Sequence, residues 1–112
     1  ESRYLMASDG IRLKVDNEHH DTKFIMYSIN YERFRRLAEQ NSTGTTRLRI
    51  GLETLRQLPI ALPPLPEQQR IASILTTIDD QIDTYQSKLE ALTRLKTGLM
   101  QQLLTGKIRV KV

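Results

Sequence analysis

Residues 66–104 carry the sequence PEQQRIASILTTIDDQIDTYQSKLEALTRLKTGLMQQLL, the longest amphipathic stretch of the chain. Its apolar residues recur at alternating intervals of four and three, the spacing of a coiled-coil seam. A continuous helix of this length would span roughly 58 Å, which is more than a small domain can cover. The pattern therefore predicts a helix whose seam packs on something outside its own domain. The predicted seam consists of Ile71, Leu75, Ile78, Ile82, Tyr85, Leu89, Leu92, Leu99 and Leu103, and Lys96 interrupts it.

Both ends of this helix carry recognisable signals. Pro66 suits the first helical position, where its missing N–H removes no hydrogen bond, and Glu67 places a carboxylate near the positive end of the helix dipole. Thr105 and Gly106 supply a glycine able to adopt the left-handed conformation that ends many helices. These signals predict a helix over residues 66–105.

The charges along the predicted helix favour an antiparallel partner. Acidic residues gather in its first half and basic residues in its second half, so a second copy placed antiparallel about Ser87 sets acid near base. In that register Lys96 faces Ile78 and lies near Asp79 of the partner, an arrangement that can fix the register of a coiled coil. We therefore expect a homodimer, or a pair with a related segment of another chain. The alternative is an amphipathic helix packed along its own domain.

Composition narrows the class of protein. The chain has 112 residues and a net charge of +4, which permits nucleic-acid binding without requiring it. The sequence contains no cysteine, so disulfides and thiolate zinc sites are excluded. No signal peptide and no apolar run of membrane-spanning length are found, so we expect a cytoplasmic protein without a membrane partner. The chain does not begin with methionine, which is typical of a fragment boundary, a tag remnant or a processed end.

The first sixty residues predict a small α+β domain. Alternating or short apolar runs predict strands at residues 3–6, 11–15 and 60–62, and residues 106–112 read as a terminal edge strand. Capping residues predict helices beginning near Asp21 and Asn30, with a short helical turn within residues 51–58. The predicted fold class is thus a small α+β domain, a proline-rich joint at residues 63–66 and one long pairing helix.

A segment rich in hydroxyl groups and arginine is the candidate DNA-binding site. Backbone amides, hydroxyls and arginine together are typical means of contacting a phosphate or a base edge, although a plain surface loop remains the alternative. The adjacent His19 and His20 do not predict a metal site, because no third ligand accompanies them. No catalytic group of residues has a persuasive spacing. The DNA-binding candidates are Lys14, Ser42, Thr43, Gly44, Thr45, Thr46, Arg47 and Arg49.

Residues 58–71, LPIALPPLPEQQRI, together with the long helix and the ending LLTGKIR, closely resemble the specificity subunit of type I restriction-modification enzymes. Residues 21–40 resemble, more loosely, the late part of a target recognition domain of that family. The resemblance implies that residues 1–62 are the C-terminal portion of such a domain. It also implies that residues 66–105 are the conserved spacer helix, and that the 42–49 segment faces DNA.

The family pattern implies two recognition domains, each followed by a helix, with the helices paired antiparallel. In that pattern the domains recognise two halves of a split double-stranded DNA site, and the helices dock the methyltransferase subunits. Motor-nuclease subunits then join to complete the restriction enzyme. This chain departs from the pattern, because it holds one helix and a recognition portion shorter than a complete one.

The resemblance implies a non-catalytic DNA-binding component, in which S-adenosylmethionine, ATP and Mg²⁺ would be used by the partner subunits. The alternative is an oligomerisation adaptor, or a truncated inhibitor, that binds the methyltransferase subunit without contacting DNA.

Overall fold

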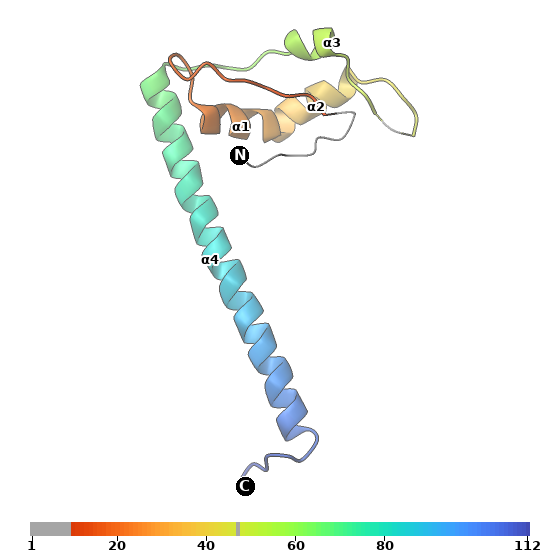
Figure 1. The fold of residues 1–112 in the computed structure, drawn as a ribbon, viewed down its shortest axis with the longest axis vertical. Coiled ribbons are helices and arrows are strands. Elements are labelled where there is room, and N and C mark those ends of the chain that lie inside the picture. Colours follow the sequence, from red (N-terminus) through yellow and green to blue (C-terminus); the bar gives the residue numbers. More distant parts are fainter. Residues whose placement is uncertain (1–9, 47) are drawn as a thin grey trace, which may run out of the picture. The chain divides into compact units, whose positions relative to one another are not determined.

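The computed structural model describes residues 10–46 and 48–112, and four helices form within them (Figure 1). They are α1 (Thr22–Asn30), α2 (Glu32–Gln40), α3 (Leu52–Arg56) and α4 (Leu65–Leu103). The chain divides into two compact units, Glu1–Ala72, here called the lobe, and Ser73–Val112, the distal unit. The first two turns of α4 therefore belong to the lobe.

Helices α1 and α2 follow one another with a single residue between them. The side chain of Asp21 accepts a hydrogen bond from the backbone N–H of Phe24 at 2.8 Å and so caps α1 as predicted. Tyr31, with φ −66° and ψ 141°, leaves the helical conformation and separates α1 from α2. The two helices contact each other within the lobe.

The lobe has a small apolar core. Phe24 and Ile25 of α1 are buried against Ala72 of α4, which is 3% exposed. Three partly buried side chains, Val15, Ile29 and Ile71, pack around them. A core of this size supplies limited hydrophobic stabilisation. Polar contacts therefore matter more to the geometry of the lobe than they would in a larger domain.

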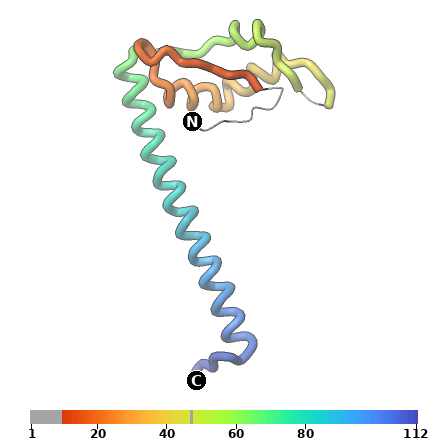
Figure 2. The backbone as a smooth tube through the Cα atoms, in the orientation of Figure 1, coloured from red at the N-terminus to blue at the C-terminus, as the bar shows by residue number. Residues whose placement is uncertain are grey.

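The predicted α+β class is not confirmed, because the described residues are mostly helical. Residues 11–15 and 60–62, predicted as strands, form irregular segments that can be followed in Figure 2, and the predicted strand at residues 3–6 lies outside the described residues. The single β pairing in the described part of the chain is an isolated antiparallel bridge between Thr43 and Arg49. An alternating sequence becomes a strand only when a neighbouring backbone accepts its hydrogen bonds.

The long helix α4 runs over 39 residues, close to the predicted bounds. Gly106, with φ 74°, adopts the left-handed conformation just beyond it, as predicted. The backbone N–H of Ile108 then donates to the carbonyl of Gln102 at 3.1 Å, which turns the chain away from the helix axis. Residues 106–112 form turns, bends and irregular backbone here, and the terminal edge strand stays a prediction. In the described ranges, no helix is both long and apolar enough to cross a membrane.

Candidate functional site

The candidate DNA-binding segment is a short hairpin. The backbone N–H of Thr43 donates to the carbonyl of Arg49, and the N–H of Arg49 donates to the carbonyl of Thr43, both at 2.8 Å. Gly44 has a φ of 118°, which favours glycine over residues with a side chain. The hairpin tip therefore lies between two residues whose backbones are paired, so the residues at the tip are presented together.

The base of this hairpin is tied to the end of α2. The hydroxyl of Ser42 donates to the carbonyl of Ala38 at 2.6 Å, and the Ser42 N–H donates to the carbonyl of Glu39 at 3.1 Å. The side-chain amide of Asn41 donates to the carbonyl of Leu37 at 2.8 Å. These bonds satisfy carbonyl groups that a helix leaves free at its C-terminus. The Ser42 hydroxyl proton is thus engaged by α2.

The remaining predicted DNA-binding residues fall into three groups. Thr43, Gly44, Thr45, Thr46 and Arg49 are exposed on the hairpin, whereas Arg47 lies outside the described residues. Lys14 is exposed in an irregular segment before α1. Among the described residues, no hydrogen bond or ion pair joins Lys14 to the hairpin.

The apolar seam of α4 is exposed from Leu75 onward. Its members range from 38% exposed at Leu75 to 69% at Tyr85, values far above those of core residues. Ile71 differs, because it packs against the lobe core. The free part of the predicted pairing surface in this chain is Leu75, Ile78, Ile82, Tyr85, Leu89, Leu92, Lys96, Leu99 and Leu103.

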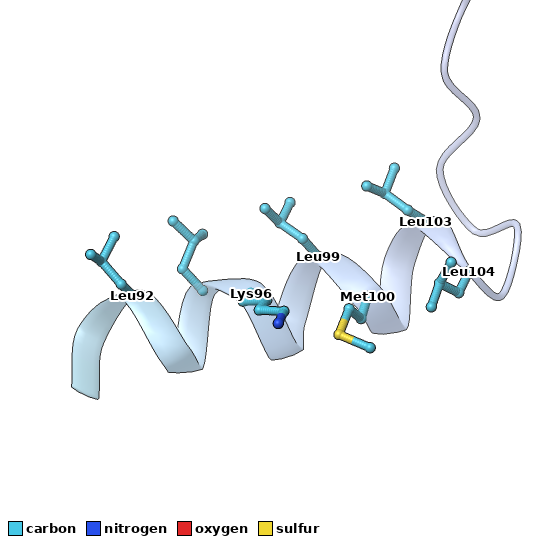
Figure 3. A pocket seen from close by; sticks show the side chains of 7 residues that line it. Leu92, Lys96, Leu99, Met100, Leu103 and Leu104 are labelled. Carbon is cyan, nitrogen blue, oxygen red and sulfur yellow. The ribbon is translucent and has the colours of Figure 1, made fainter. Parts of the chain in front are cut away.

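The end of α4 carries a wider apolar surface. Figure 3 shows Leu92, Leu99 and Leu103 projecting from the same side of the helix. Beside this row, additional apolar side chains and one lysine line a shallow hollow, so the surface is broader than a narrow coiled-coil seam. The lining residues are Leu92, Leu95, Lys96, Leu99, Met100, Leu103 and Leu104.

A group of polar side chains precedes α1. Ligand-type atoms of Asp16, Glu18 and His19 lie within 4.8 Å of one another, and all three residues are exposed. The Nδ1 atom of His19 lies 2.7 Å from a carboxylate oxygen of Asp16. This hydrogen bond, followed by the one from the Glu18 backbone N–H, lowers the pKa of the Asp16 carboxyl from its ordinary value of 3.8. The proximity alone assigns no metal, because exposed acidic groups commonly lie close together.

Sequence reasoning treated Gln68 only as one letter of the Glu-Gln-Gln-Arg motif. In the structure it is 1% exposed and hydrogen-bonded to the distant Asp21 and to the nearby Pro63, while Glu67, Gln69 and Arg70 around it are exposed. The sequence holds one signal for this burial. Gln68 lies one helical turn before Ala72 and therefore shares its face of α4.

With these features in place, comparison with known proteins identifies the family. The family model described as the type I restriction modification DNA specificity domain matches residues 1–94. The chain therefore belongs to this family, and the resemblance seen in the sequence is confirmed.

Two relatives from Methanocaldococcus jannaschii are specificity subunits by description. The chain is 36% identical over 99 residues to that of the MjaX type I restriction enzyme, an alignment that covers 88% of this chain and 23% of the relative. It is 35% identical over 101 residues to that of the MjaVIII enzyme, covering 90% of this chain and 23% of the relative. The chain thus spans about a quarter of the length of these relatives. No solved structure matches it significantly.

Proposed function

We propose that the chain is a non-catalytic DNA-binding component of a type I restriction-modification system. In this proposal the lobe contacts double-stranded DNA, and α4 pairs antiparallel with a second α4. The pair sets the separation of two lobes on a bipartite site and positions methyltransferase and motor-nuclease subunits there. Methyl transfer with S-adenosylmethionine, and DNA translocation and cleavage with ATP and Mg²⁺, belong to those partners.

The observation that carries the proposal is the exposed seam of a 39-residue helix in a chain of this family. Leaving the eight apolar seam positions from Leu75 to Leu103 in water forgoes apolar burial worth about 25 cal/mol for each Å² covered. Pairing about Ser87 sets the seam in matched layers, which are Ile71 with Leu103, Leu75 with Leu99, Ile82 with Leu92 and Tyr85 with Leu89. The same register sets Lys96 against Ile78 and near Asp79 of the partner.

The hairpin supports the DNA contact within this proposal. Its exposed threonines and Arg49 belong to one short loop that the paired backbones of Thr43 and Arg49 close. Arginine and hydroxyl groups are among the side chains that contact phosphates in protein–DNA complexes. Arg47 and Lys14 add positive charge in the same unit of the chain, and each phosphate that is neutralised releases counterions.

A salt series of binding to duplex DNA tests the proposal. The double variant Arg47→Ala/Arg49→Ala removes two charges from the hairpin, and Arg33→Ala/Arg35→Ala removes two charges from α2 as a matched control. We expect the hairpin variant to bind more weakly and its plot of log affinity against log salt to flatten by about 1.8, because each phosphate contact contributes about 0.9. The control variant should keep the wild-type slope.

Two results would contradict the proposal in different ways. Equal binding by the hairpin variant and the wild type would remove the hairpin from the interface. An absence of any binding by the wild-type chain at low salt, combined with retained binding to the methyltransferase subunit, would identify an adaptor that does not contact DNA.

A further inference from the structure

Gln68 is the one polar residue that is buried in the part of the chain the structure describes. It lies in the first turn of α4 that follows the proline-rich joint, and all its contacts fall within the lobe. An uncompensated amide in such a place would destabilise the fold, because its lost hydrogen bonds to water would not be replaced. Since no buried side-chain atom in the described residues is without a hydrogen bond, the amide is compensated.

The two ends of the Gln68 amide bind different segments. Its oxygen accepts a hydrogen bond from the backbone N–H of Asp21 at 3.0 Å. Its nitrogen donates to the carbonyl of Pro63 at 2.8 Å and lies 3.5 Å from Nδ1 of His20. One side chain thus joins the start of α1 and the joint to the first turns of α4.

The rest of the contact between α1 and α4 has little directional character. It consists of Phe24 and Ile25 packed on Ala72, with Ile71 beside them. Apolar contact of this kind favours burial but not one particular rotation, whereas hydrogen bonds lose strength steeply when their angles change. The amide of Gln68 adds directional contacts here, because it is hydrogen-bonded both to the start of α1 and to the joint.

We propose that Gln68 is a positioning residue that fixes how the start of α1 and the proline-rich joint are oriented on the first two turns of α4. Because each lobe carries a hairpin and α4 is continuous, Gln68 thereby sets which separation of two DNA half-sites a pair of chains can bind. The statement about orientation stands on the hydrogen bonds alone, and the statement about half-sites rests on the proposed function.

Distance measurement between two spin labels tests the orientation directly. The chain has no cysteine, so Glu39→Cys and Glu90→Cys place one label on α2 and one on α4, and dilution with unlabelled chain suppresses distances between copies. Gln68→Met removes both hydrogen bonds at similar volume, and Gln69→Met is the control at the exposed neighbour. We expect a broader distance distribution for Gln68→Met and an unchanged one for Gln69→Met.

Gln68→Glu separates the two bonds. Its carboxylate still accepts from the Asp21 N–H but cannot donate to the Pro63 carbonyl, so we expect a distribution broader than that of the wild type. Equal widths for the wild type, Gln68→Met and Gln68→Glu would overturn the inference. Loss of the folded lobe in both Gln68 variants, seen as loss of hydrogen-exchange protection in α1, would also overturn it, because Gln68 would then hold the fold instead of orienting it.

Selection from a pool of random-sequence duplex DNA tests the consequence for half-sites. The wild type should enrich bipartite sequences with one spacing, and Gln68→Met should enrich the same half-sites with several spacings. A merely structural role would lower binding at every spacing alike and leave the preferred spacing unchanged, which would contradict the inference. If the wild type enriches no bipartite sequence, the proposed function fails, and the label distances still decide the role of Gln68.

Discussion

The side-chain oxygen of Gln68 lies 3.0 Å from the backbone nitrogen of Asp21, a residue 47 positions earlier in the chain. Asp21 uses its own carboxylate to cap α1 through the N–H of Phe24. The residue that caps α1 therefore also donates its backbone N–H to Gln68 of α4. This double use couples the stability of α1 to its placement on α4, and it leads to separate predictions for the side chain and the backbone.

Replacing Asp21 by alanine should destabilise the lobe by about 1 kcal/mol, because the cap acceptor is lost. Asp21→Asn keeps an oxygen acceptor and should retain most of that stability. The backbone N–H that binds Gln68 is present in both variants. Amide hydrogen exchange in α1 measures the free energy of opening, and equal protection in Asp21→Ala and the wild type would show that the cap contributes nothing.

Ala72 should tolerate no larger side chain, because it is 3% exposed against Phe24 and Ile25. Overpacking a core position typically costs about 1–3 kcal/mol, so Ala72→Leu should lower the stability of the lobe by that amount. Ala91, also on α4, is exposed, and Ala91→Leu serves as the control with no expected loss. Urea unfolding followed by hydrogen exchange in α1 distinguishes the two, and a tolerated Ala72→Leu would contradict the observed packing.

The pairing of α4 predicts that a charge in the seam disrupts association. Ile82→Asp would bury an unpaired carboxylate, which costs about 3 kcal/mol or more and corresponds to a dissociation constant raised by more than about 100-fold. Ser87→Asp adds the same charge outside the seam and should leave the dimer intact. Sedimentation equilibrium measures the dissociation constants of both variants. A wild-type chain that is monomeric with no partner present would contradict the homodimer.

Lys96 and Asp79 offer a test of the register. In the antiparallel pairing, Lys96→Glu places two carboxylates near each other and should weaken the dimer by about 1 kcal/mol for each of the two symmetric contacts. The double variant Lys96→Glu/Asp79→Lys restores opposite charges and should recover the affinity. A double variant no better than Lys96→Glu would reject this register, although another pairing would remain compatible with the exposed seam.

The long helix could be predicted from sequence because its signals are local. Pro66, the seam spacing and Gly106 act through neighbours within a few residues. The observed helix begins next to Pro66 and ends shortly before Gly106. The strands predicted at residues 11–15 and 60–62 do not form, because a strand depends on a partner backbone that the alternation does not specify. The sequence does not distinguish Gln68 from Gln69, because the two differ only in burial. The burial of Gln68 follows from how α1 packs on the start of α4.

Acid should weaken the turn before α1 through Asp16. The pKa of this carboxyl is lowered in the folded chain, chiefly by the hydrogen bond from His19. A lowered pKa means that the folded state favours the ionised form. This contribution is therefore fully present above the ordinary Asp pKa of 3.8 and is lost as the pH falls through the lowered folded pKa.

A pH titration of the Asp16 carboxyl carbon by NMR measures this shift. His19→Ala removes the largest cause, so we expect the Asp16 pKa to move upward toward its ordinary value. Glu18→Gln keeps the backbone N–H that also binds Asp16 and should leave the lowered pKa in place. If both variants titrate like the wild type, the His19 hydrogen bond does not persist in solution. Both hydrogen bonds to the Asp16 carboxylate come from residues within three positions of it. The lowered pKa of Asp16 therefore reports on the conformation of this turn and not on the packing of the lobe.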